Sequence, residues 1–248
     1  MIAARPKVLI VDDDPVSLAF LQAAVGRCGC EAIGAADAAT ALAGLHVDGV
    51  DLLLIDRCMP GTDGPALLHA ARALGIQAAA IATSAELDET IKAALHAAGF
   101  VDTLLKPANL ATIQQLLQRF VTSSATASID ASVGIEEAGS MALLDDAAAL
   151  TAIGGDHGVL RALRVLFGAE LDEVALEADI GGPVQRCAMI GRLHRMRASC
   201  RICGASALGS AALQFEHALR EDVNDAASAQ AAFVRLCIAT KQAIAAAT

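Results

Sequence analysis

Short apolar runs alternate with stretches of helical spacing over the first 121 residues of the chain. The apolar runs lie at 7–11, 31–34, 50–55, 78–82 and 101–105, and the helical stretches lie at about 15–28, 38–47, 64–74, 86–97 and 109–121. Such alternation predicts a parallel sheet with helices on both faces. The run 50–55 is apolar apart from Asp51, as expected of a central strand buried on both sides. We therefore expect an α/β fold with a doubly wound five-stranded parallel sheet.

The pattern changes after residue 121. Residues 122–142 are rich in Ser, Thr, Ala and Gly and carry acids at Glu136 and Glu137, which is typical of a linker. No strand pattern recurs beyond 143, where Ala- and Leu-rich stretches have helical spacing at about 156–178, 184–203, 206–221 and 225–246. We expect a first domain over 1–121, a linker over 122–142 and an all-α antiparallel four-helix-type bundle over 143–248.

Composition excludes several classes of protein. The 248 residues are 55% apolar, enough for two packed domains, yet no apolar run reaches the roughly 18 residues that a membrane span needs. A formal charge of −10 and the absence of Trp and Tyr argue against nucleic acid as a partner, because phosphate contacts need a basic face and stacking needs aromatic rings. Seven scattered cysteines without a secretory signal predict reduced thiols. We expect a cytoplasmic protein that contacts neither membrane nor nucleic acid.

Polar side chains stand where the predicted strands end, at Asp12, Asp13, Asp56, Thr83 and Lys106. The carboxyl ends of parallel strands converge on one crevice. Carboxylates gathered there repel one another unless a cation is present, and such hard oxygen ligands suit Mg²⁺, which also accepts substrate phosphate. Asp56 can then act as a nucleophile toward phosphorus, while Lys106 stabilises the phosphoryl charge and the Thr83 hydroxyl donates to the same group.

In these residues the segment 5–121 resembles the receiver domain of bacterial response regulators, which implies a flavodoxin-like fold. The motifs that carry the resemblance are Val8-Leu9-Ile10-Val11-Asp12-Asp13, Leu52-Leu53-Leu54-Ile55-Asp56 with Met59-Pro60-Gly61, Ile81-Ala82-Thr83-Ser84 and Leu105-Lys106-Pro107. The resemblance implies that Asp56 is the phosphoacceptor, that Asp12, Asp13 and Asp56 hold Mg²⁺ with the Cys58 backbone carbonyl, and that Lys106-Pro107 is a cis peptide. Asp14, one residue past the acidic pair, is expected to cap the helix that starts at Pro15.

The chain departs from the receiver pattern at three positions. Thr103 stands where receivers usually place a switching Tyr or Phe, so we expect weak output through the nearby helical face. Cys58 and Ala85 stand two residues after Asp56 and Thr83. In receivers the side chains at these two places orient or block the water that hydrolyses the phosphoryl group, and neither Cys nor Ala orients water well. These substitutions predict slow self-dephosphorylation; a phospho-Asp56 lifetime of only seconds would contradict that prediction.

A second candidate site lies on one predicted helix, where His194, Arg197, Ala198 and Arg201 fall on one face at spacings of three, four and seven. A neutral imidazole is a competent nucleophile for phosphoryl groups, and cations one turn away favour the neutral form and pair with the product. Residues 143–246 resemble a histidine phosphotransfer (HPt) domain, with Arg197 and Ala198 in place of the Lys and Gly of its His-x-x-Lys-Gly pattern. The extra methyl of Ala198 is a possible hindrance to docking.

Other features near this helix have simpler explanations. The basic stretch contains Arg186, Arg192, Arg195, Arg197 and Arg201. It is either a solvated helix face or a surface that steers the helix onto an acidic receiver pocket. Cys200 and Cys203 with His194 fall short of a closed zinc site, so buried thiols are the better interpretation. The remaining histidines are expected at the surface or at helix ends: His46, His69, His96, His157 and His217.

The two motif sets together indicate a two-component phosphorelay protein that accepts phosphoryl groups on Asp56 and exchanges them on His194. We expect sensor or hybrid histidine kinases and other receiver domains as partners, with receiver–HPt docking within the molecule as a further possibility. The chain contains no Gly-rich ATP-binding half and no DNA-binding module, so we expect a phosphoryl carrier and not an ATP-dependent kinase. Two alternatives stay open: phosphorylation of Asp56 switches access to His194 without sharing phosphoryl groups, or the protein is a phosphate sink.

Overall fold

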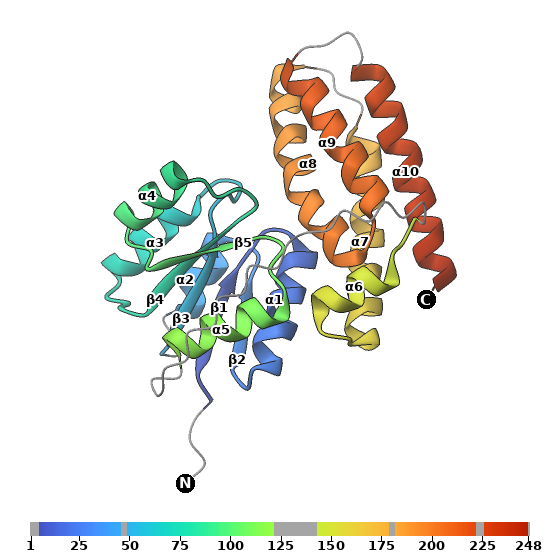
Figure 1. Ribbon diagram of the computed structural model, residues 1–248. Coiled ribbons are helices and arrows are strands. Elements are labelled where there is room, and N and C mark those ends of the chain that lie inside the picture. The colour runs from blue at the N-terminus through green and yellow to red at the C-terminus, as the bar shows by residue number, and fades with distance from the viewer. Residues whose placement is uncertain (1–4, 46–48, 122–142, 179–181, 222–225, 248) are drawn as a thin grey trace.

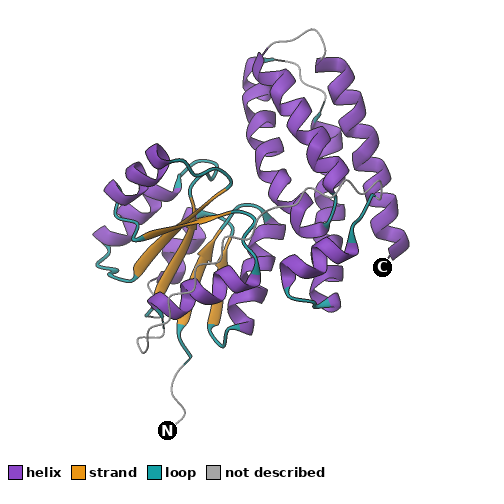
Figure 2. Cartoon of the chain, in the orientation of Figure 1, coloured by secondary structure: helices purple, strands orange, loops and turns teal. Residues whose placement is uncertain are grey.

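The computed structural model describes residues 5–45, 49–121, 143–178, 182–221 and 226–247. The predicted linker 122–142 lies outside these residues, as does His46. The rest forms an α/β domain followed by a helical bundle (Figures 1 and 2). None of the helices among these residues is long and apolar enough to cross a membrane.

A five-stranded parallel sheet forms the centre of the α/β domain, in the order β2-β1-β3-β4-β5. Its strands are β1 (Lys7–Val11), β2 (Glu31–Ala35), β3 (Leu52–Asp56), β4 (Ala79–Ser84) and β5 (Asp102–Leu105). The intervening helices are α1 (Pro15–Arg27), α2 (Ala38–Leu45), α3 (Gly64–Ala73), α4 (Glu89–Ala97) and α5 (Leu110–Phe120). The predicted doubly wound sheet is therefore confirmed, with each element within a few residues of its expected range.

Alternation along the central strands explains the two cores of this domain. Val8 and Ile10 point to a cluster that includes the apolar faces of α1 and α5, whereas Leu9 and Val11 point to a cluster with α2, α3 and α4. All five residues of β3 are buried because helices cover both sides of the sheet. The helices start at polar N-caps, among them Asp14, whose carboxylate accepts a hydrogen bond from the Val16 backbone N–H as predicted.

Four long helices form the bundle, and a short one precedes them. The long helices are α7 (His157–Glu177), α8 (Pro183–Cys203), α9 (Ser206–Glu221) and α10 (Ala226–Ala247). Each packs against its sequence neighbour and α10 returns to α7, which closes the bundle. The helix α6 (Asp146–Ile153) was absent from the ranges expected from apolar spacing, because its eight residues show almost no amphipathic contrast.

The turn after α8 depends on a glycine. Gly204 adopts φ 76°, and its backbone carbonyl accepts a hydrogen bond of 2.8 Å from the Asp145 N–H at the start of α6. A side chain at this position would meet the Asp145 backbone. Gly204 thus ends α8 and lets α6 approach it closely.

The two domains pack against each other through α1 and α7 (Figure 1). The core cluster of α1 and α5 continues without interruption into the bundle. At the far end of α1, the Arg27 guanidinium donates to the backbone carbonyls of Ile153 and Gly154 at 3.4 and 3.2 Å. Apolar burial next to directional hydrogen bonds holds α8 at the carboxyl edge of the sheet.

Candidate functional site between the sheet and the bundle

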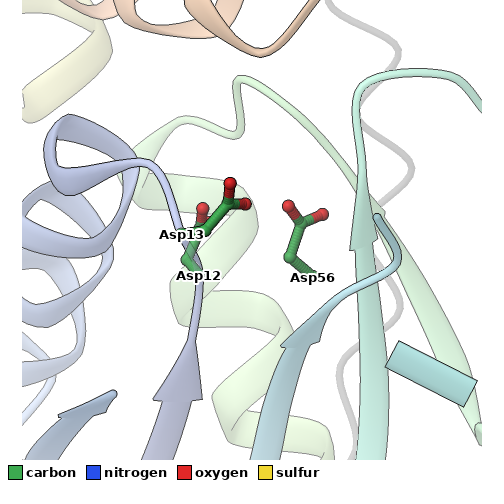
Figure 3. A group of neighbouring side chains, drawn as sticks. All are labelled: Asp12, Asp13 and Asp56. Carbon is green, nitrogen blue, oxygen red and sulfur yellow. The ribbon is translucent and has the colours of Figure 1, made fainter. Parts of the chain in front are cut away.

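Three carboxylates meet at the carboxyl edge of the sheet (Figure 3). Asp12 and Asp13 follow β1, and Asp56 is the last residue of the neighbouring strand β3. One oxygen from each carboxylate lies within 4.8 Å of the others, and the group is the one cluster of potential metal ligands among the described residues. Figure 3 shows the carboxylates of Asp13 and Asp56 directed into the same gap. The predicted convergence of these side chains is confirmed.

Lys106 supplies the positive charge closest to two of these carboxylates. Its Nζ lies 2.7 Å from Asp12 Oδ2 and 3.1 Å from Asp56 Oδ2. Burial alone would lower the pKa of Lys106, but the Asp12 and Asp56 carboxylates outweigh it and raise that pKa above its ordinary value. Burial raises the pKa of Asp12, an effect that Lys106 only partly offsets. The pocket therefore holds more negative charge than its own lysine neutralises.

Three buried oxygens at this edge of the sheet have no hydrogen-bond partner among the described residues: Asp12 Oδ2, Asp13 Oδ1 and the Thr83 hydroxyl. Of these, Asp12 Oδ2 forms an ion pair with Lys106. Thr83 is 1% exposed and stands opposite Asp56 in the register of β3 and β4. An unpaired carboxylate oxygen next to two further carboxylates fits a hard divalent cation, and an unpaired hydroxyl nearby fits an oxyanion.

The backbone around Asp56 is closely packed. The Arg57 N–H donates to the Thr83 carbonyl at 2.9 Å, and the Gly64 N–H donates to the Arg57 carbonyl at 3.0 Å. Gly64 lies so near the Asp56 carbonyl that a Cβ at that position would collide with it. The carboxylate of Asp56 is thus presented from a rigid backbone, whereas Cys58, two residues later, is exposed at the pocket rim.

Helix α8 of the bundle lies over this pocket. Asp56 and Lys106 line one cavity together with His194, Arg195 and Ala198. Nε of Arg195 lies 3.1 Å from Asp13 Oδ2. One turn further along α8, the Ser199 hydroxyl donates to Asp14 Oδ2 at 2.6 Å, and both residues are buried. The aspartate pocket and the histidine helix, 138 residues apart between Asp56 and His194, therefore form one site.

The His194 imidazole contacts carboxylates from both domains. Its Nδ1 lies 3.5 Å from Glu216 Oε1 on α9 and 3.7 Å from Glu86 Oε1 after β4. Glu216 is 4% exposed and is also paired with Arg197 and Arg220. Burial by itself raises the pKa of Glu216, yet its proximity to His194 and Arg220 holds that pKa below its ordinary value. A charged carboxylate therefore faces Nδ1 of the histidine.

Residues 8–118 match the family model of the response regulator receiver domain. The N-terminal α/β domain is a response regulator receiver domain. Among curated relatives, the chain is 26% identical over 230 residues to the sensor histidine kinase GacS of Pseudomonas protegens, an alignment covering 88% of this chain and 24% of the kinase. It is 32% identical over 133 residues to the transcriptional regulatory protein PrrA of Mycobacterium tuberculosis, covering 52% of this chain and 57% of PrrA.

Two solved structures similar to this chain each cover about half of it. The chemotaxis protein CheY4 of Vibrio cholerae is 28% identical with a TM-score of 0.46, covering 48% of this chain and all of CheY4. The receiver domain of the sensor histidine kinase PA1611 from Pseudomonas aeruginosa, with a magnesium ion coordinated in its active site cleft, is 29% identical with a TM-score of 0.45 and the same coverage. The chain spans about a quarter of the length of the GacS kinases it matches. Their alignments extend beyond residue 118 into the bundle, because they cover 88% of this chain.

The expected cis peptide, buried thiols and surface histidines are found among the described residues. The Lys106-Pro107 peptide is cis. Cys200 and Cys203 are fully buried free thiols, and no metal-binding group among the described residues includes them. The four described histidines outside α8 are exposed: His69, His96, His157 and His217.

The expected face of α8 is only partly the one that meets the receiver. His194 and Ala198 line the pocket, but Arg197 turns toward Glu216 on α9 and Arg201 is exposed. The roles of Arg197 and of the Cys58 carbonyl stay predictions. Sequence reasoning missed Ser199 and Glu216 and treated Arg195 only as part of a basic stretch; Arg195 follows the candidate nucleophile directly, and that position was the available signal.

Proposed function

We propose that this chain is a phosphorelay protein in which Asp56 of the receiver and His194 of an HPt bundle exchange a phosphoryl group. The observation that carries the proposal is that both residues line one cavity between the domains. Such placement turns transfer between two sites into an intramolecular step, which removes the cost of bringing them together.

On the receiver side, Asp12, Asp13 and Asp56 would hold Mg²⁺, with the Cys58 carbonyl as a further ligand. The cation supplies positive charge for phosphoryl oxygens. An Asp56 oxygen forms the new O–P bond as the N–P bond of a phosphohistidine donor breaks, and the donor imidazole leaves with the electron pair. Lys106 balances the phosphoryl charge and the unpaired Thr83 hydroxyl donates to a phosphoryl oxygen.

On the bundle side, Nε2 of His194 is the attacking nitrogen, because Nδ1 is directed at Glu216 and Glu86. The Nε2 lone pair forms an N–P bond as the O–P bond to Asp56 breaks, and Asp56 regains its carboxylate charge next to Lys106. Glu216 keeps the imidazole oriented and stabilises the positive charge that develops on the ring. The small Ala198 beside His194 leaves room for the receiver surface.

We propose sensor or hybrid histidine kinases as donors to Asp56 and other receiver domains as exchange partners for His194. The similarity of 88% of this chain to part of the GacS sensor histidine kinases supports such a pathway. A second candidate function is a switch, in which phosphorylation of Asp56 changes access to His194 without transfer between them. Two contacts support this switch: Arg195 pairs with Asp13, and Ser199 donates a hydrogen bond to Asp14. Both connect the bundle to the pocket that contains Asp56.

A single-turnover time course with ³²P-labelled acetyl phosphate distinguishes these functions. Wild type is compared with Asp56→Asn and His194→Gln, with His217→Gln as control because His217 is exposed on α9. Relay predicts an alkali-stable, acid-labile label at His194 that appears after the Asp56 label and is absent from Asp56→Asn. His194→Gln should retain label on Asp56 alone. Label that stays on Asp56 in the wild type, while His194 exchanges normally with an added receiver, would instead establish the switch.

A further inference from the structure

The contact between Arg195 and Asp13 lies inside the candidate cation site. Arg195 Nε is 3.1 Å from Asp13 Oδ2, and Asp13 contributes one of the three clustered carboxylates. The two side chains are 29% and 14% exposed, so water screens their attraction only in part. Arg195 of the bundle is thus paired with a carboxylate, Asp13, that would also be a ligand of the cation.

The charges of the pocket are divided between two internal cations. Lys106 contacts Asp12 and Asp56, and among the described residues its contacts do not include Asp13. Arg195 forms an ion pair with Asp13. Burial raises the pKa of Asp13, and the charge of Arg195 offsets part of that rise. A divalent cation between the carboxylates would place a second positive charge against Asp13, next to the guanidinium.

The other contacts between the domains leave the cation site untouched. Ser199 donates to Asp14 Oδ2, which also accepts from Ser17 Oγ at 2.8 Å as part of the cap of α1. Arg27 contacts the turn after α6 at the opposite end of α1. A further contact, between His194 Nδ1 and Glu86 Oε1 at 3.7 Å, involves a carboxylate outside the cluster. Among these described contacts between the domains, Arg195 is therefore the one that reaches the cation site directly.

We propose that Arg195 is an internal counter-ion of the receiver pocket, so that a divalent cation and the docked bundle compete for Asp13. The inference rests on the proposed function, since it assigns a regulation to the same pocket. By linkage, the cation weakens docking by the factor by which docking weakens cation binding. Cation loading then weakens docking of α8 without abolishing it, so that outside partners gain access to Asp56 and His194 in the released fraction while transfer between the two residues proceeds in the docked fraction.

The test measures binding of Mn²⁺ to the full-length protein by electron paramagnetic resonance of the free ion, without any phosphoryl donor. Arg195→Gln should bind Mn²⁺ about three- to tenfold more tightly than wild type, the scale of one partly exposed ion pair. Arg201→Gln is the matched control, because Arg201 is exposed on the same helix. It should stay within about twofold of wild type, since its charge is screened by water.

Small-angle scattering on the same proteins tests the reciprocal effect. Saturating Mg²⁺ should enlarge the radius of gyration of wild type, whereas Ser199→Ala, with weakened docking and an intact Arg195, should be larger already without the cation. Two results would overturn the proposed competition without touching the proposed function. One is Mn²⁺ binding by folded Arg195→Gln that is equal to or weaker than that of wild type, and the other is a wild-type radius of gyration that does not change with Mg²⁺. If neither wild type nor Arg195→Gln bound Mn²⁺, the cation site of the proposed function would fall as well.

Discussion

The receiver pocket and the histidine site are built in opposite ways. The pocket collects side chains from four strand ends, so Asp12, Asp56, Thr83 and Lys106 are held by a buried sheet. The histidine site stands on one helix, and a single buried carboxylate from α9, Glu216, faces its imidazole. A site spread over a sheet needs many residues at fixed positions, whereas a site on one helix needs few. The first kind of site is therefore easier to recognise in a sequence than the second.

The two regions also differ in charge. Lys106 pairs with two of the three clustered carboxylates, Asp12 and Asp56, while α8 brings Arg195 to the third, Asp13. The excess of negative charge on one side and the guanidinium on the other make the surfaces complementary. Substitutions in the receiver pocket and in the histidine site should therefore have distinguishable consequences.

Replacing Lys106 with Met should slow phosphorylation of Asp56 about 10²- to 10³-fold, because a buried ammonium at the phosphoryl charge is lost. Single-turnover labelling with acetyl phosphate measures the rate. Lys92→Met is the control, since Lys92 pairs with Glu89 on the exposed face of α4. A Lys106→Met rate within threefold of wild type would show that the pocket does not work as a charge-stabilising site.

Gly204→Ala should lower the free energy of unfolding of the bundle by about 2–4 kcal/mol. The residue would have to keep φ 76° with a Cβ pressed against the Asp145 backbone. Gly155→Ala has a similar φ of 84° but open space, and should cost about 1 kcal/mol. Urea unfolding followed by circular dichroism compares the two. Equal losses would mean that close approach of α6 contributes nothing.

Glu216→Gln should slow phosphoryl acceptance by His194 about tenfold, because the neutral amide stabilises a positive imidazole less well. Transfer from a phosphorylated receiver domain supplied in excess reports on this step. Glu221→Gln removes a carboxylate that pairs with exposed His217 on the same helix and should leave the rate unchanged. Identical rates for both variants would reduce Glu216 to a structural partner of Arg197 and Arg220.

Glu170 on α7 should make stability depend on pH near the domain interface. Burial raises its pKa to about 8, with Asp14 and Glu173 adding to the rise and Arg192 and Arg195 opposing it. The folded protein therefore binds this proton more tightly than the unfolded chain does. Stability from this group is present in full below the ordinary pKa of 4.5 and is lost as the pH rises through about 8.

The Glu170→Gln variant tests that dependence. Its free energy of unfolding should change less than that of wild type between pH 5 and pH 8, by about 3 kcal/mol. Urea titrations at both pH values measure the difference, with Asp172→Asn as the control change on α7, because Asp172 is exposed and pairs with Lys241. An unchanged pH slope in Glu170→Gln would indicate that this carboxyl is ionised within the folded protein.

Much of the receiver was predictable because its chemistry and its fold share one pattern. Asp12, Asp56 and Thr83 lie at or next to the carboxyl ends of apolar strands, where parallel strands place ligand-binding residues, so they appear at the expected spacing. The bundle was harder, since helical spacing locates α7 to α10 but passes over the short α6. The partners of His194 could not be read from the chain, because Glu86 and Glu216 reach it from other elements.

The sequence by itself determined the α/β and all-helical halves, the acidic triad with Lys106, and the helix that presents His194. Periodicity and capping are local, and they act between residues close in the chain. Only the tertiary structure decided that α8 lies over the pocket, that Arg195 and not Arg197 meets a receiver carboxylate, and that Ser199 binds the cap of α1. These contacts depend on which apolar surfaces are buried together and on which charges are paired across the domains. Neither produces a periodic pattern in the sequence.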